Sequence, residues 1–236
     1  MGLDKIPDTM QAVQVVEYNK PYELRTVPVP KALQPTDLLV KVAVASNCHT
    51  DGMVQAGVFK TKLPCTASHE GAGTVVAVGE SVTEFKEGDR VMCGSVSLKR
   101  PEKFTQYCPN SAGAVGVTTD GAFAEYVVVD SRATTPLPDK ITFASAAPLA
   151  CAGRTVWRGI LETELTKGSW LALIGSGGGL GHLGIQFAKA LGLMVVGVDA
   201  RDEGLELSRS AGADVVVDAR KGKEKVVEEV QKVTGE

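Results

Sequence analysis

The sequence lacks a long apolar run, an export signal and an excess of either charge. Its 236 residues carry 25 lysines and arginines against 28 aspartates and glutamates, so the formal net charge is −3. A balance this close to neutral gives no basic surface for nucleic acid or for an anionic membrane. No apolar run is long enough to span a bilayer, and the first residues have no apolar signal core. We therefore expect a cytoplasmic protein with neither nucleic-acid nor membrane partners.

Cysteine is scarce as well, with five widely spaced residues. An odd set of cysteines in a reducing compartment indicates core thiols, catalysis or metal binding, not a disulfide framework. Hydrophobic residues make up 44% of the chain, which is enough to bury a substantial core.

The spacing of apolar residues changes near residue 150, which predicts two domains, residues 1–152 and 153–236. In the first domain, short segments rich in Val and Ala alternate with Gly, Pro and Asp turns, as in a curled, barrel-like β domain. The expected strands are residues 13–16, 37–45, 72–78, 90–92 and 124–129.

In the second domain, strands and helices alternate, which predicts an α/β fold. The expected strands are residues 170–174, 193–198 and 214–217, and the expected helices are residues 180–191, 203–210 and 223–233. This order is one mononucleotide-binding half of a doubly wound parallel sheet. The sequence stops where a fourth strand should follow, so we expect a truncated chain with only the first half of such a domain.

A glycine-rich turn follows the strand at residues 170–174 and opens the next helix. Gly175, Gly178 and Gly181 are evenly spaced, and Gly179 and Leu180 lie between the last two. Glycines permit a tight turn and a close approach of the backbone to a pyrophosphate. The helix N-terminus adds free N–H groups and partial positive charge. These five residues are therefore candidates for cofactor binding, and the alternative is a glycine-rich loop without a ligand.

Asp199 ends the second strand, about 20 residues after the glycine turn, where an acid hydrogen-bonds the adenosine ribose. A carboxylate there repels a 2′-phosphate, so NAD is favoured over NADP. Arg201 weakens this preference, because an arginine can bind that phosphate. Alternatively, Asp199 only caps a helix.

Three residues are candidate metal ligands: Cys48, His69 and Cys151. Two thiolates and one neutral imidazole can hold zinc and leave the fourth tetrahedral position open. The three residues are far apart in the sequence, however, and buried cysteines are common in cores. Spacing alone therefore does not establish a metal site.

Several motifs occur together in one order along the chain. They are Cys48-His49-Thr50-Asp51, His69-Glu70-Gly71, Gly88-Asp89-Arg90-Val91, Cys151-Ala152-Gly153 with Thr155, and the glycine turn with Asp199. In these motifs the chain closely resembles the zinc-containing medium-chain alcohol dehydrogenases, particularly the microbial ones. The resemblance implies a GroES-like catalytic domain, a Rossmann NAD-binding domain, and oxidation of a small alcohol to an aldehyde or ketone.

The resemblance also implies the roles of individual residues. Cys48, His69 and Cys151 would bind one catalytic Zn²⁺. Asp51 would orient the imidazole of His69, and Glu70 would lie close behind the metal. Thr50 would hydrogen-bond the substrate oxygen and pass its proton outward. Simpler interpretations stay open for two of these, since Thr50 can be a turn hydroxyl and Glu70 a structural carboxylate.

Two further residues would contact the cofactor by the same resemblance. His49 would lie near the pyrophosphate and Thr155 near the nicotinamide. The simpler interpretation of His49 is a surface histidine in a loop.

The chain departs from the family at several positions. Many relatives bind a second, structural zinc through four closely spaced cysteines, but the matching stretch here has only Cys93 and Cys108. We therefore expect no structural zinc and two free thiols there. Cys65 is expected to be apolar filling. Met53 replaces the histidine that often ends the proton relay, and Ser68 replaces a glycine before the histidine ligand.

Two other functions stay open. One is a zinc-free quinone or enoyl reductase of the same superfamily, against which the presence of Cys48, His69 and Cys151 argues. The other is a non-catalytic fragment that binds nucleotide or a partner. A full-length form is expected to be a homo-oligomer, but this is doubtful for the chain as given.

Overall fold

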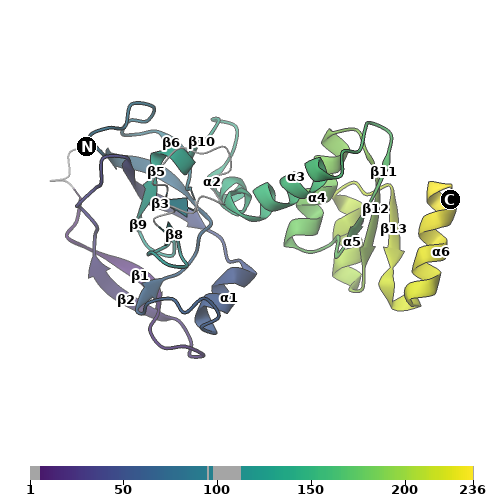
Figure 1. Ribbon diagram of the computed structural model, residues 1–236, viewed down its shortest axis with the longest axis horizontal. Helices are drawn as coiled ribbons and strands as arrows, with labels where there is room; N and C mark the ends of the chain where they lie inside the picture. Colours follow the sequence, from purple (N-terminus) through teal and green to yellow (C-terminus); the bar gives the residue numbers. More distant parts are fainter. Residues whose placement is uncertain (1–5, 95, 98–112, 236) are drawn as a thin grey trace. The chain divides into compact units, whose positions relative to one another are not determined.

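The computed structural model describes residues 6–94, 96–97 and 113–235. The chain divides into two compact units, Met1–Cys151 (unit 1) and Ala152–Glu236 (unit 2) (Figure 1). Each unit has its own buried apolar clusters.

Unit 1 is built mainly from antiparallel strands. Its larger sheet has the order β10-β6-β5-β3-β9, a second sheet has the order β2-β1-β4, and β7 and β8 form a short pair. The strands are β1 (Thr9–Val15), β2 (Glu23–Pro28), β3 (Asp37–Ala45), β4 (Cys65–Thr66), β5 (Gly71–Val78), β6 (Arg90–Met92), β7 (Val96–Ser97), β8 (Gly113–Ala114), β9 (Tyr126–Asp130) and β10 (Thr135–Pro136). The helices and helical turns are α1 (His49–Gln55), η3 (Ser131–Ala133), α2 (Phe143–Ala146) and η4 (Ala147–Ala150).

The central strand β3 explains why this sheet curls around a core. Leu38 and Val40 are fully buried, and they pack with residues such as Val75 and Val127 from the two neighbouring strands. Burial of each such side chain contributes about 1.5–3 kcal/mol. The register between β3 and β5 shifts twice, between Leu39 and Val40 and again beyond Val42. Irregularities of this kind bend a strand, which favours a curled sheet.

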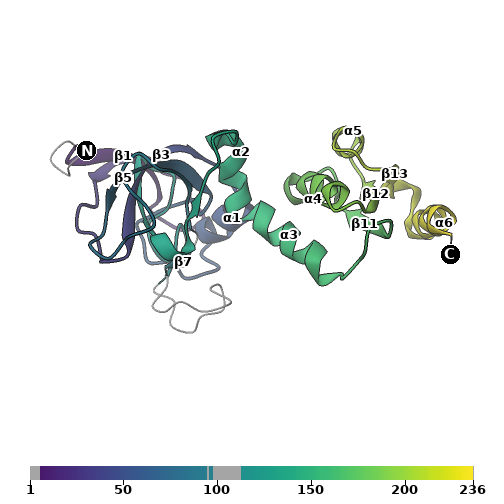
Figure 2. The same ribbon diagram turned by 90° about the horizontal axis from the view of Figure 1, so that it is seen from above.

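Unit 2 is a parallel sheet covered by helices on both faces. Its strands β11 (Trp170–Ile174), β12 (Met194–Asp199) and β13 (Val215–Asp218) lie in the order of the sequence. Its helices and helical turns are α3 (Ala152–Glu162), α4 (Gly179–Ala190), α5 (Asp202–Ser210), η5 (Ala219–Lys221) and α6 (Lys223–Thr234). Figure 2 shows α4 and α6 on opposite sides of the strands. Separate apolar clusters against α4 and against α6 agree with that arrangement.

This architecture confirms the expected α/β class, with a β-rich unit followed by a Rossmann-type sheet. The expected strands and helices are present, and most of their bounds differ by only a residue or two. Several elements were not expected, among them β2, α1 and α3. The sequence of α1, HTDGMVQ, has no apolar period of its own, and contacts with other parts of unit 1 hold it in place.

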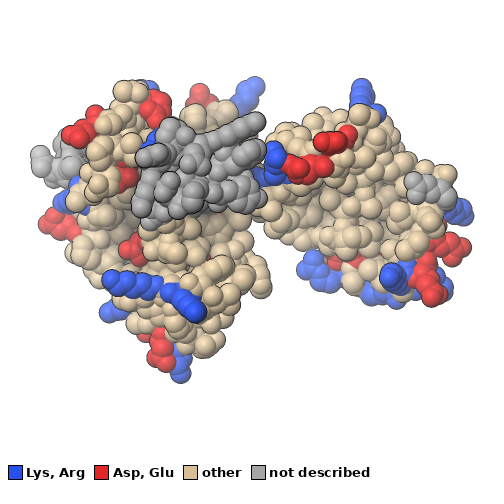
Figure 3. All heavy atoms as spheres, viewed as in Figure 1, with Lys and Arg blue, Asp and Glu red and all other residues tan. Residues whose placement is uncertain are grey.

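Charged side chains of both signs are scattered over the face of both units shown in Figure 3. None of the helices in the described part of the chain has the length and apolarity that a membrane span requires.

Candidate functional site

Four side chains of unit 1 form a cluster with the chemistry of a metal site. Cys48, His69, Glu70 and Cys151 each offer a ligand atom, and these atoms all lie within 4.8 Å of one another. Cys48 is the residue before α1, His69 and Glu70 precede β5, and Cys151 follows η4. The fold therefore brings together three segments that are distant in the sequence, including the three predicted zinc ligands.

The burial of the cluster fits a bound cation. His69 and Glu70 are 7% and 2% exposed, whereas Cys48 and Cys151 are half-buried. The Nδ1 atom of His69 is buried and has no hydrogen-bond partner among the described residues. An unsatisfied buried polar atom costs about 1–3 kcal/mol. Two thiolates and one imidazole are donors that zinc prefers, so a zinc ion beside this ring fits the residues present.

Asp51 joins two of the cluster's segments. Its carboxylate is fully buried and accepts the backbone N–H of Cys48 (2.8 Å) and that of Ser68 (3.0 Å). The resemblance implied a contact between Asp51 and the ring of His69, but no such hydrogen bond occurs in the part of the chain that the structure describes. The two oxygens already bind backbone donors. Asp51 therefore positions the neighbouring backbone, and its role in orienting the imidazole stays a prediction.

Thr50 and Glu70 both lie beside the cluster. The Cys48 thiol contacts the Thr50 hydroxyl at an Sγ–Oγ1 distance of 3.7 Å. The hydroxyl of Ser46 donates to Oε2 of Glu70 at 2.7 Å, which fixes that carboxylate. Met53 lies one turn further along α1 and is half-buried.

Ser68 has a left-handed backbone, with φ of 70°. Glycine adopts this conformation without strain, whereas a serine must offset a steric cost. The Ser68 hydroxyl donates to the backbone oxygen of Ser46 at 3.0 Å, and the side chain is fully buried. The serine thus adds a hydrogen bond between two segments of the site.

Two other cysteines of unit 1 stand apart from the cluster. Burial raises the pKa of Cys93 to about 12, and burial together with the charge of Asp120 raises that of Cys65 to about 12. Both are free thiols that stay protonated near neutral pH. Cys108 lies outside the described residues, so the absence of a structural zinc stays a prediction.

The glycine turn of unit 2 has the geometry of a tight strand-to-helix connection. Gly175 directly follows β11 with φ of 71°, and Gly178 precedes the first residue of α4. A Cβ atom on Gly181 would lie 2.3 Å from the backbone oxygen of Gly175, so no larger residue fits there. Gly179 and Leu180 begin the helix, and Leu180 is 45% exposed.

Asp199 ends β12 and binds the glycine turn directly. Its carboxylate accepts the backbone N–H groups of Gly177 (2.9 Å), Ala200 (2.8 Å) and Arg201 (3.1 Å). Burial acts to raise the pKa of Asp199, but these hydrogen bonds and the charge of Arg201 outweigh it, and the pKa is lowered. A Cβ on Gly204 would lie 2.4 Å from this carboxylate. Sequence reasoning missed Gly177 and Gly204. Gly177 lay within the motif, whereas Gly204 gives no local signal.

The two remaining predicted cofactor residues lie in different units. His49 is the first residue of α1 in unit 1, and Thr155 lies on α3 in unit 2. Both are exposed. Their proposed contacts with a cofactor stay predictions.

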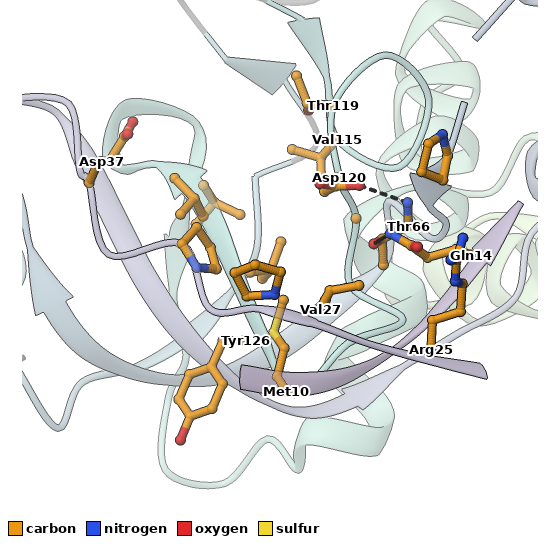
Figure 4. Close-up of a pocket in the computed structure, with 18 of the residues that line it drawn as sticks. Met10, Gln14, Arg25, Val27, Asp37, Thr66, Val115, Thr119, Asp120 and Tyr126 are labelled. Atoms are coloured by element: carbon orange, nitrogen blue, oxygen red, sulfur yellow. Dashed lines mark hydrogen bonds between the residues drawn. The ribbon is translucent and has the colours of Figure 1, made fainter. Parts of the chain in front are cut away.

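A cavity of about 770 Å³ lies elsewhere in unit 1 (Figure 4). It extends along β9 and is lined by residues that include Met10, Arg25 and Tyr126. None of the four cluster residues lines it. We assign the chemistry to the cluster, because its donor atoms converge, whereas the described residues that line this cavity include no comparable group of metal-donor atoms.

Comparisons with known proteins agree with this geometry. Residues 34–139 match the alcohol dehydrogenase GroES-like domain, and residues 179–236 match the zinc-binding dehydrogenase family. An alcohol dehydrogenase of Rhizobium meliloti (strain 1021) is 40% identical over 96% of this chain and 68% of its own length. This chain belongs to the zinc-binding medium-chain alcohol dehydrogenase family.

Further members of the family are also similar. An alcohol dehydrogenase of Geobacillus stearothermophilus is 38% identical over 89% of this chain and 64% of its own length. The crystal structure of the Aeropyrum pernix alcohol dehydrogenase has a TM-score of 0.84 and 32% identity, covering 95% of this chain and 68% of that one. The chain thus spans 64–68% of the length of the curated relatives it matches.

Two other solved structures broaden the range of relatives. One is from Sinorhizobium meliloti 1021, described as a zinc-binding dehydrogenase and bound to NADP, with 30% identity and a TM-score of 0.80 over 92% of this chain and 64% of that one. The other is a quinone oxidoreductase of Pseudomonas syringae pv. Tomato DC3000, with 28% identity and a TM-score of 0.76 over 96% of this chain and 63% of that one.

Proposed function

We propose that this chain carries the catalytic zinc site and the cofactor-binding turn of an NAD-dependent alcohol dehydrogenase. The reaction is reversible hydride transfer between a small alcohol and the nicotinamide, which gives an aldehyde or a ketone. The observation that carries the proposal is the convergence of Cys48, His69 and Cys151, with Glu70 beside them, within 4.8 Å. The free thiols of Cys48, Cys65 and Cys93 suit the reducing cytoplasm, where we place the protein.

Each residue at the site has its own proposed role. Cys48, His69 and Cys151 would hold a zinc ion. Zinc in such a site polarises the oxygen of an alcohol or a carbonyl. The hydroxyl of Thr50, beside the Cys48 thiol, accepts the proton of the alcohol and passes it to water. Met53 lies further along the same helix and has no group that could continue a relay.

Glu70 provides a carboxylate beside the two cysteines of the site. The hydrogen bond from Ser46 holds its carboxylate in place beside the thiolates. This added charge offsets that of a divalent cation. Asp51 keeps the backbone of Cys48 and Ser68 at a fixed separation, and this separation preorganises the ligands.

The cofactor preference follows from Asp199 and Arg201. The lowered pKa keeps Asp199 ionised at neutral pH, and an anion at this place repels a 2′-phosphate. Arg201 lies 3.5 Å from that carboxylate, and its side chain is 63% exposed, so it remains available to a phosphate. We therefore propose NAD as the preferred cofactor and NADP as a weaker one. One similar structure is bound to NADP, which supports the phosphorylated cofactor as the weaker alternative.

The first experiment measures bound zinc per chain by elemental analysis, together with NADH formation from short-chain primary and secondary alcohols. About one zinc per chain and alcohol-dependent NADH formation would support the proposal. A matched pair of variants separates the site from general effects on folding. Cys48→Ala should lose zinc, whereas Cys65→Ala, outside the cluster, should keep it. Absence of zinc from the purified protein under metal-replete conditions would contradict the proposal.

The similarity to a quinone oxidoreductase supports a second candidate, a zinc-free reductase. This function predicts quinone reduction by NAD(P)H in protein treated with a chelator. The dehydrogenase predicts that the same treatment abolishes alcohol oxidation and that zinc restores it. The two outcomes are distinct, because only one activity depends on the metal.

A further inference from the structure

The short helix α1 begins directly after Cys48, one of the four cluster residues, yet it is only seven residues long. Cys48 precedes its first residue, and Thr50 and Asp51 lie in its first turn. A helix this short is not stable by itself in water. Other parts of unit 1 must therefore hold it in place, and their contacts set the position of the Cys48 thiol.

Asp51 holds α1 to the segment that carries His69. Its carboxylate accepts the N–H groups of Cys48 and Ser68, as described above. The segment before His69 is held in turn by β4, which pairs with the end of β1 at Gln14–Thr66 and Val15–Cys65. The end of β1 is thus tied to one of the three segments that carry cluster residues.

The connection between β1 and β2 also holds α1. The hydroxyl of Tyr22 donates to the backbone oxygen of Asp51 at 2.7 Å. The backbone N–H of Asn19 donates to the backbone oxygen of Gln55 at 2.8 Å, and the Gln55 side chain donates to the backbone oxygen of Lys20 at 2.7 Å. Tyr22 is the side chain of this connection that reaches the helical turn next to Cys48.

We propose that Tyr22 is a positioning residue for the metal cluster: its hydroxyl holds the first turn of α1 so that the Cys48 thiol faces His69 and Cys151. The inference rests on the proposed function for its consequence in metal binding, and on the geometry alone for its effect on α1. The hydrogen bonds of Tyr22 and of the Asp51 side chain thus tie the same helical turn to two other segments of unit 1.

The environment of Tyr22 keeps its hydroxyl protonated, so that it can donate a hydrogen bond. The side chain is half-buried, and burial raises its pKa, as does the charge of Asp51. The hydroxyl therefore stays protonated throughout the pH range in which the enzyme would work. Tyr18 supports the segment after α1 in the same way. Its hydroxyl hydrogen-bonds the backbone oxygen of Thr61, and its ring packs closely under Gly57.

The test uses Tyr22→Phe, which removes only the hydroxyl. The control is Tyr126→Phe, because the Tyr126 hydroxyl makes no hydrogen bond within the described ranges and points away from Asp120 and Thr66 in Figure 4. Hydrogen–deuterium exchange of the metal-free proteins is measured first. Loss of one hydrogen bond of ordinary strength should accelerate exchange in residues 48–56 by about fivefold in Tyr22→Phe, with no change in Tyr126→Phe.

The second measurement is the rate at which zinc passes to a competing chelator, with the absorption spectrum of cobalt-substituted protein as a check on ligand geometry. Tyr22→Phe should release zinc about fivefold faster and should change the thiolate-to-cobalt bands, whereas Tyr126→Phe should match the unsubstituted protein. Equal exchange rates in the two variants, or equal acceleration in both, would overturn the proposal.

The two proposals fail in different ways. If the unsubstituted protein binds no zinc, the dehydrogenase function is contradicted, and the exchange comparison still decides the role of Tyr22. If zinc binds and the exchange rates of α1 do not respond to Tyr22→Phe, the role of Tyr22 is contradicted, and the dehydrogenase function stands.

Discussion

Replacement of Asp51 by asparagine should destabilise unit 1 strongly, although it changes only one atom of the side chain. The carboxylate is fully buried, and its two oxygens accept two backbone N–H groups. An asparagine amide has one acceptor oxygen, so its NH₂ group would face an N–H donor. One hydrogen bond to a charged group, worth about 1.5–3 kcal/mol, is lost, and a buried donor is left without a partner. We expect a loss of about 2–4 kcal/mol in the free energy of unfolding.

The control for this change is Asp120→Asn. Asp120 is exposed, and one of its oxygens accepts the backbone N–H of Thr66 at 2.7 Å. Asparagine can accept that bond equally well. The same chemical substitution should therefore cost less than about 1 kcal/mol at this position.

Urea unfolding of metal-free protein would measure both variants. The two tryptophans of the chain, Trp157 and Trp170, both lie in unit 2. Tryptophan fluorescence therefore reports on unit 2, and circular dichroism reports on both units. In Asp51→Asn, the dichroism transition should move to lower urea, and the fluorescence transition should stay in place. A cost for Asp51→Asn no larger than that for Asp120→Asn would refute the argument that Asp51 joins two backbone segments.

Three further predictions concern the glycine turn, the proton path and the buried thiols. Gly181→Ala should weaken NADH binding at least about tenfold, because the added Cβ would lie 2.3 Å from a backbone oxygen. Fluorescence titration would measure the affinity, and the zinc content should not change. An unchanged affinity would contradict the turn geometry. Met53→His should increase the rate of alcohol oxidation at low pH, and an unchanged pH–rate profile would count against a relay through α1. Cys93 and Cys65 should resist iodoacetamide in the folded protein at pH values below about 12, because burial keeps both thiols protonated. An unfolded thiol ionises above about pH 8.5, so the free energy of unfolding should decline as the pH rises above that value. A free energy of unfolding that stays constant there would contradict the raised pKa values.

The strands of unit 2 could be predicted from the sequence because their signal is local. The strand β12 is a continuous apolar run, and the helix α4 before it begins at a glycine turn. Composition and turn chemistry therefore suffice to predict both elements. The same applies to β3, where valines and leucines dominate. Each of these elements is specified mainly by its own residues.

The helix α1 and the contact of Gly204 with Asp199 could not be predicted in this way. Tertiary hydrogen bonds hold α1, and the close approach of Gly204 arises when two elements pack. The cluster of Cys48, His69, Glu70 and Cys151 could be predicted only in part. Its ligand types were visible in the sequence, but only the resemblance selected Cys48, His69 and Cys151 as a set, because their spacing carries no local information.

The hydrogen bonds of Asp51 bear on how such a site can change in evolution. Asp51 holds the backbone N–H groups of residues 48 and 68, not the side chains that we propose as metal ligands. Any residue except proline can supply those donors. A substitution at position 48 can therefore remove metal binding and leave the framework of the loops intact. A family built in this way can lose its metal and acquire a different chemistry by exchange of ligands alone, without having to find a new fold.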